Sequence, residues 1–157
     1  MTDRPSPIPR RARPYQGRPA GVVTRFAAAV VDAAVVLLAL VLGYGAVAAV
    51  RFMLTPRRFR LPDAAWFFNV TIALAVAVCY LAAGWSLSGR TYGDLVMGLR
   101  VIGRTGGAVR PLIAVVRALV CVLFPIGLLW CAVSREQRSL PDLVLRTRVV
   151  YDWRPAA

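Results

Sequence analysis

The stretch FAAAVVDAAVVLLALVLGYGAVAAV, residues 26–50, is one apolar run whose single charged side chain is Asp32. At a rise of about 1.5 Å per residue, a helix of this length exceeds the hydrocarbon core of a bilayer, which is roughly 30 Å thick. A second run, residues 64–87, carries Trp66 near its start and Trp85 near its end, where an aromatic belt would lie. We therefore expect two helices that each cross a membrane.

A third apolar run, residues 112–133, is less regular than the other two. Arg117 lies well inside it, and Pro125 and Gly127 interrupt its middle. Such a segment crosses the membrane, kinks, or turns back toward the side from which it came. The sequence thus predicts an all-α integral membrane protein with three hydrophobic helical segments, of which two are full spans and the third is kinked or re-entrant.

The overall composition indicates a membrane protein rather than a soluble one. Of 157 residues, 59% are hydrophobic and 17% are charged, and the net charge of +13 comes from 20 arginines without a lysine. Because these arginines crowd the ends of the apolar runs, they are typical of topology signals, and we expect no nucleic-acid partner. Residues 1–20, rich in proline and arginine, should form a disordered basic tail, residues 21–152 the transmembrane domain, and residues 153–157 a C-terminal tail.

An internal repeat relates two distant parts of the chain. YGDLVMGLRVI, residues 92–102, aligns without gaps on LPDLVLRTRVV, residues 140–150, with five of eleven positions identical, among them Asp94 with Asp142 and Arg100 with Arg148. In each copy a hydroxyl side chain stands three residues ahead of the aspartate, which is the spacing of a capping box. A short amphipathic helix at the membrane surface should follow each of these caps.

Each copy then ends in a strand-like stretch, residues 99–102 and 147–151. We expect the two short strands to form a pair, which requires the third apolar run to re-enter the membrane and return to one face.

The distribution of arginines favours this re-entrant arrangement. We place the N-terminus in the cytoplasm. A re-entrant third run then puts 15 arginines on the cytoplasmic side: 6 through residue 25, 4 in residues 90–110 and 5 after residue 133. Only the 4 arginines in residues 51–60 lie outside, which agrees with the positive-inside rule. Three full crossings would move the last five outside and give 10 against 9. We therefore favour a re-entrant third run in the cell membrane; three crossings, as in an inverted-repeat transporter, remain the alternative.

Charged side chains in the apolar runs are the candidate functional residues. Arg25 and Asp32, seven residues apart, fall on nearly one helix face but about 10.5 Å apart along the axis, too far for a direct salt bridge. Arg25 can extend to the headgroups, whereas an ionised Asp32 inside the membrane costs about 2.5 kcal/mol or more unless it is paired. Arg117 reaches a similar depth, so we predict an Asp32–Arg117 pair, which either locks the helices together or leaves Asp32 as a titrating or cation-binding carboxylate in a transport path.

Several short motifs occur in a characteristic order. They are Arg25 with Asp32, then GRTYG at 89–93, GLRVI at 98–102, RSLPD at 138–142 and TRVV at 147–150. In this order and spacing, residues 20–152 resemble the RDD family, of the actinobacterial type, which is named for one arginine and two aspartates. The resemblance implies that Arg25, Asp32 and Asp142 are the signature residues, and it implies a suspected role in transport.

The chain departs from the family pattern at three positions. Asp94 stands where relatives often carry a basic residue, Pro141 where they often carry histidine, and Arg146 where they often carry glycine. No role for a histidine or for a glycine-specific turn is therefore expected in the second copy of the repeat.

The residue types present limit the chemistry that the chain can perform. Without histidine or lysine, the usual Ser-His, Cys-His and Ser-Lys catalytic units cannot be built, so we expect no enzyme activity. Cys79, Cys121 and Cys131 are isolated in apolar runs, so we expect no metal site and no cofactor.

Two functions remain open at this point. The first is a transport-related role, in which Arg25, Asp32 and Arg117 line a cation or proton path enclosed by a homo-oligomer. The alternative is a membrane anchor or assembly factor that binds a partner protein of unknown identity or anionic lipid headgroups.

Overall fold

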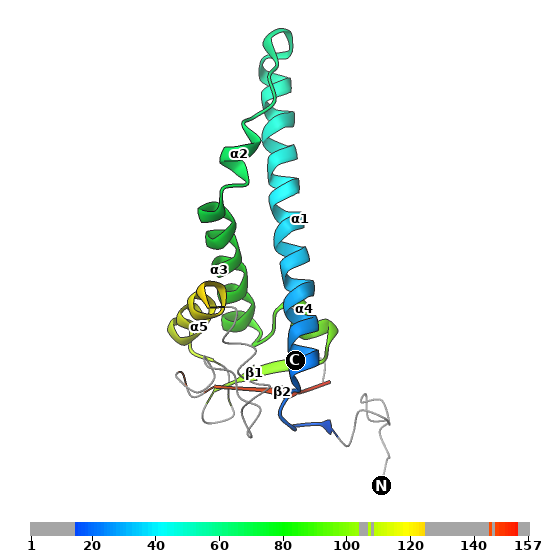
Figure 1. Ribbon diagram of the computed structural model, residues 1–157, viewed down its shortest axis with the longest axis vertical. Helices are drawn as coiled ribbons and strands as arrows, with labels where there is room; N and C mark the ends of the chain where they lie inside the picture. The colour runs from blue at the N-terminus through cyan, green and yellow to red at the C-terminus, as the bar shows by residue number, and fades with distance from the viewer. Residues whose placement is uncertain (1–14, 104–106, 108, 125–144, 146, 154–157) are drawn as a thin grey trace.

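Two long antiparallel helices form the frame of the molecule (Figure 1). The computed structural model describes residues 15–103, 107, 109–124, 145 and 147–153. Helix α1 covers Val22–Leu54 and helix α3 covers Val70–Leu87. Within the described residues, these are the two helices that are long and apolar enough to cross a membrane. The expectation of two apolar helices of spanning length is thereby confirmed.

The second apolar run is two helices rather than the single one expected. Helix α2, Ala64–Phe67, ends before helix α3 begins, and a 3₁₀ turn, η2 at Pro56–Arg58, precedes it. The side chain of Asn69 accepts a 2.8 Å hydrogen bond from the backbone N–H of Thr71 and so caps α3. Asparagine favours this N-cap geometry, which explains why the new helix starts here.

The end of the α1–α3 hairpin that lies away from η2 and α2 carries the first copy of the repeat and a small sheet (Figure 1). We call it the sheet end. Helix α4, Tyr92–Val96, begins at the predicted capping box, in which the Thr91 hydroxyl accepts from Asp94 N–H and the Asp94 carboxylate accepts from Thr91 N–H. The corresponding cap at Ser139 and Asp142 lies outside the described residues.

The predicted strand pair is present. Strand β1, Leu99–Ile102, pairs antiparallel with strand β2, Arg148–Tyr151, with Leu99 opposite Tyr151 and Ile102 opposite Arg148. Because the strands are hydrogen-bonded, the chain between them leaves and returns to the same end of the α1–α3 hairpin.

Helix α5, Pro111–Leu123, is the described part of the third apolar run and packs against α3. Its 13 residues extend about 20 Å, less than the thickness of a hydrocarbon core. Pro125 and Gly127, the expected corner of this run, lie outside the described residues.

Both ends of the described chain are held against the sheet. Gly17 and Ala20 donate backbone hydrogen bonds of 2.8 and 3.0 Å to the carbonyls of Tyr151 and Val149, so the segment lies along the free edge of β2. The backbone N–H of Trp153 donates to the side-chain oxygen of Gln16 at 3.2 Å. Residues 15–20 and residue 153 therefore contact one another and the edge of the sheet.

Candidate functional site

Asp32, which lies nearly three turns after the start of α1 at Val22, is held by three hydrogen-bond donors. Its Oδ1 accepts from the Tyr80 hydroxyl and from Gly93 N–H, both at 2.8 Å, and its Oδ2 accepts from the Thr91 hydroxyl at 2.7 Å. The residue is only 7% exposed. Since the donors come from α3 and from the start of α4, this carboxylate joins three helices, as a buried polar group requires.

Gly93 permits this contact because α4 lies directly against α1. A Cβ at position 93 would collide with the backbone carbonyl of Ala28 and would lie 2.9 Å from Cγ of Asp32. Only glycine allows the two backbones to come this close. The glycine that ends the GRTYG motif therefore has a steric role.

Asp94 extends the same hydrogen-bond network. Its Oδ2 accepts from the indole N–H of Trp85 at 2.9 Å, in addition to the capping bond from Thr91. Trp85 is 6% exposed, so our assignment of this side chain to an aromatic belt at the membrane interface was wrong. Its indole N–H is instead used inside the protein, because a buried donor needs an acceptor.

Arg25 binds the start of α1 to the sheet. Its Nε donates to the Ala20 carbonyl at 3.2 Å and its Nη2 to the Val149 carbonyl at 3.5 Å. We expected this side chain to extend to lipid headgroups, but it is buried. Its guanidinium satisfies backbone carbonyls at the helix–sheet junction, where hydrogen bonds to a charged donor are strong.

Arg117 does not form the expected pair with Asp32. Its guanidinium lies over the ring of Trp85, 4.9 Å from the centroid, and Nη1 donates to the hydroxyl of Thr147. Among the described residues, the salt bridges join Arg90 and Arg100 to Asp152, and none joins Asp32 to Arg117. The physical reason is that neutral donors of α3 and α4 already occupy the Asp32 carboxylate, while the Trp85 face accommodates the cation.

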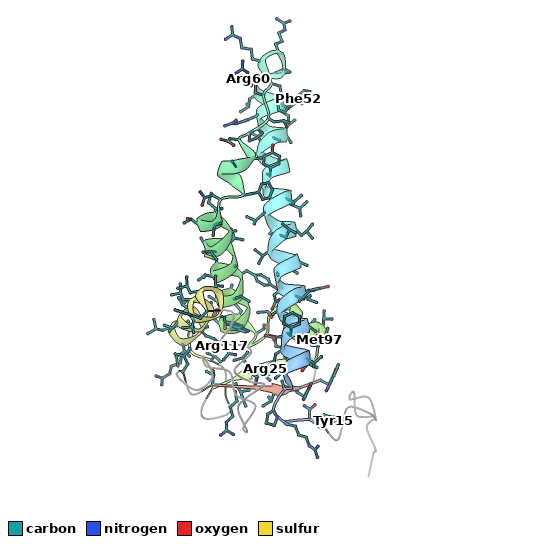
Figure 2. The ribbon with its side chains drawn as sticks, in the orientation of Figure 1. Tyr15, Arg25, Phe52, Arg60, Met97 and Arg117 are labelled. Carbon is teal, nitrogen blue, oxygen red and sulfur yellow. The ribbon has the colours of Figure 1, made fainter. Side chains whose placement is uncertain are left out.

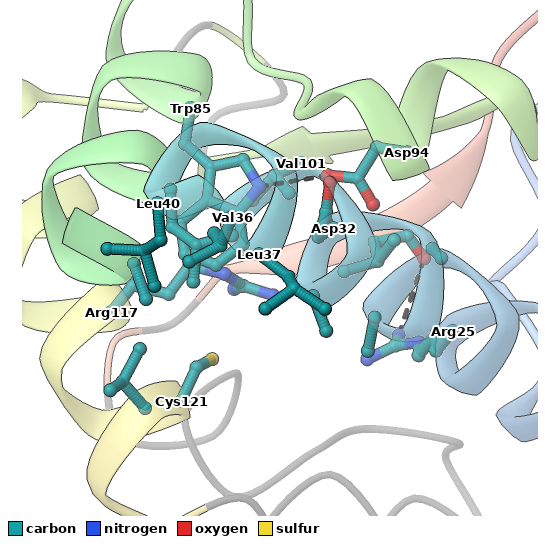
Figure 3. A pocket seen from close by; sticks show the side chains of 17 residues that line it. Arg25, Asp32, Val36, Leu37, Leu40, Trp85, Asp94, Val101, Arg117 and Cys121 are labelled. Carbon is teal, nitrogen blue, oxygen red and sulfur yellow. Dashed lines mark hydrogen bonds between the residues drawn. The ribbon is translucent and has the colours of Figure 1, made fainter. Parts of the chain in front are cut away.

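Four of the five buried charged residues that the structure describes nevertheless line one cavity of about 390 Å³ between α1, α3 and α5 (Figure 3). Arg25, Asp32, Asp94 and Arg117 line its polar part, and aliphatic side chains line the remainder. Figure 2 shows that Arg25 and Arg117 lie at the sheet end of the hairpin, far from Phe52 and Arg60 at the other end.

The repeat arginines do not occupy equivalent environments. Arg100 forms a 3.3 Å ion pair with Asp152, which also pairs with Arg90 at 3.0 Å, whereas Arg148 is exposed on β2. Sequence reasoning missed Asp152, since nothing in its local pattern marks it. Among the described residues, no cluster of three or more histidine, cysteine or acidic side chains could hold a metal ion.

Comparison with known proteins supports the resemblance seen in the motifs. Searches against curated proteins and against solved structures return no match. The family model of the RDD family matches residues 19–146, which include Arg25, Asp32 and Asp142, although Asp142 itself lies outside the described residues. Because the match covers well over half of the sequence, the chain belongs to the RDD family.

Proposed function

We propose that this protein is a multi-pass protein of the cell membrane with its sheet end and N-terminus in the cytoplasm. The arginine distribution supports this orientation, since 15 arginines would lie on the cytoplasmic side and 4, those of residues 51–60, outside. The β1–β2 pairing agrees with it, because both copies of the repeat then face the same compartment. Without histidine or lysine in the chain, we propose no catalytic activity.

We propose further that the role is transport-related and that the cavity at the sheet end is part of a cation or proton path. The observation that carries this proposal is that buried charges from α1, α4 and α5 converge on one cavity. Charges placed within spans are costly, and they are typical of ion and proton paths. Asp32 is the proposed ionisable group, and Tyr80 and Thr91 are the hydroxyls that contact it.

A single copy cannot enclose such a path with two spans, so we propose a homo-oligomer as the working unit. An assembly that separates into monomers in mild detergent, and keeps full transport when reconstituted as monomers, would contradict this part of the proposal. Cross-linking determines the oligomeric state in native membranes, and measurement of the particle size determines it in detergent.

The transport proposal is tested by reconstituting the full chain into vesicles and measuring proton and cation flux with entrapped dyes. Asp32→Asn keeps the shape and one of the two acceptor oxygens but removes the ionisable group, and we expect it to abolish flux. Asp63→Asn makes the same chemical change at an exposed position at the other end of the molecule and should leave flux unchanged. Absence of flux in the wild type, or equal flux in both variants, would defeat the proposal.

The second candidate is a membrane anchor or assembly factor that binds a protein partner or anionic headgroups. It is favoured by the three donors on Asp32, because a carboxylate so held organises the fold whether or not it titrates. A deletion strain restored equally by the wild type and by Asp32→Asn would favour this second function over transport.

A further inference from the structure

We infer that the cavity between α1, α3 and α5 binds an anionic phospholipid, with the phosphate near Arg117 and one acyl chain along the aliphatic part. It deepens the second candidate function, the binding of anionic headgroups, and does not depend on whether ions move. It rests on the form of the cavity, on the charges at its base and on the surface where it opens.

The cavity changes from polar to aliphatic along the axis of α1. One face of this helix lines it from Arg25 to Leu40, with lining residues three or four positions apart. Arg25 and Asp32 belong to the lower part of this face, and Val36, Leu37 and Leu40 to the upper part. The face extends about 22 Å along the axis, so it matches an elongated ligand that is polar at one end. The volume of about 390 Å³ is in the usual range for ligand pockets.

The charged base of the cavity offers a buried guanidinium to an acidic headgroup. Asp32 and Asp94 already accept five hydrogen bonds from the chain itself, three on Asp32 and two on Asp94, so these carboxylates are engaged within the protein. Arg117 extends from α5 into the cavity with its guanidinium beside Trp85 (Figure 3), and its Nη1 also donates to the hydroxyl of Thr147. It is 2% exposed. A guanidinium in such a dry environment binds phosphate oxygens strongly and with defined geometry.

The opening of the cavity points to a lipid rather than to a water-soluble anion. Leu37 lines the cavity and is also 57% exposed, so the aliphatic part opens on the apolar outer surface of α1. In a protein that spans the membrane, this surface faces acyl chains. A free phosphate would leave the aliphatic part unfilled, whereas a phospholipid fills both parts and keeps its second chain in the bilayer.

The test is native mass spectrometry of the full chain released from micelles that contain phosphatidylglycerol, phosphatidylcholine with the same chains, or glycerol phosphate. We expect retention of phosphatidylglycerol and loss of the other two. Arg117→Gln should weaken phosphatidylglycerol binding at least about tenfold, because a charge-assisted hydrogen bond is lost. Arg148→Gln removes the same charge from an exposed position at the same end and should have no such effect.

A second pair of variants covers the case in which Arg117→Gln does not fold. Val36→Phe fills the aliphatic part and should displace the lipid, whereas Leu38→Phe, on the exposed side of α1, should not. Equal retention of the two phospholipids, equal loss in both members of a variant pair, or retention of glycerol phosphate as strong as that of the lipid would overturn the inference. Retained phosphatidylglycerol without ion flux would defeat the proposed function alone.

Discussion

The two ends of the α1–α3 hairpin are built by different means. At the sheet end, Asp32 and Asp94 connect α1, α3 and α4 through buried hydrogen bonds, and the buried apolar residues gather around the two strands. At the other end, the contacts include those of Tyr44 with Pro62 and Phe68 and of Phe52 with Phe59, and most of the described side chains are exposed. The comparison teaches that polar contacts between helices hold one end together, while the other end depends on its surroundings, as expected where lipid is as apolar as the helices themselves.

The largest expected effect comes from separating α4 from α1. Gly93→Val would place a branched side chain against the Ala28 carbonyl and Asp32, and we expect a loss of more than about 4 kcal/mol in unfolding free energy. Gly45→Val is the matched control in the same hairpin, since a Cβ at Gly45 meets nothing within 4 Å. Unfolding by SDS in mixed micelles measures both, and equal stability of the two variants would show that α4 does not pack against α1 as described.

Removing the shared acceptor should have the next largest effect. Asp32→Ala leaves the buried donors of Thr91 and Gly93 and the partly buried hydroxyl of Tyr80 without their acceptor, and we expect a loss of about 3 kcal/mol in the same unfolding measurement. Asp63→Ala, which loses one exposed hydrogen bond to Ala65 N–H, should cost less than about 1 kcal/mol. If the two variants lose similar amounts, the buried network is not what stabilises the sheet end.

Several elements of the sheet end could be predicted from the sequence, whereas the partners of its buried charged side chains could not. The capping box at Thr91 and the strand pair were predicted because both depend on local spacing and on a repeat. The partners of Asp32 and Arg117 were not predicted, because tertiary packing determines them. Asp32 accepts from neutral hydroxyl and backbone donors instead of from Arg117, and Arg117 lies over the ring of Trp85 instead of pairing with Asp32. Opposite charges at similar depth are therefore a weak guide to pairing in a membrane helix bundle, and the glycine of GRTYG was the better signal of close approach.

Trp85 offers a finer test of the same end. Trp85→Phe keeps an aromatic face for Arg117 but removes the indole N–H that donates to Asp94, so we expect a loss of about 1.5 kcal/mol. Trp153→Phe, at a partly exposed position, should cost less. Near-ultraviolet circular dichroism, recorded with the unfolding curve, shows whether the packing around the ring is kept. A neutral result for Trp85→Phe would mean that the Asp94 carboxylate finds another donor.

The smallest effect should come from the other end, where one hydrogen bond can be removed with little change in shape. Tyr44→Phe deletes the hydroxyl that donates to the Pro62 carbonyl at 3.2 Å and keeps the ring against Phe68. We expect a loss of about 0.5 kcal/mol, because interhelical hydrogen bonds in membranes contribute little when the competing states find partners as well. Tyr80→Phe makes the same chemical change at the sheet end and removes one donor from the buried Asp32, so it should cost at least about twice as much. Equal losses for the two tyrosines, measured in the same SDS unfolding series, would remove the distinction between the two ends.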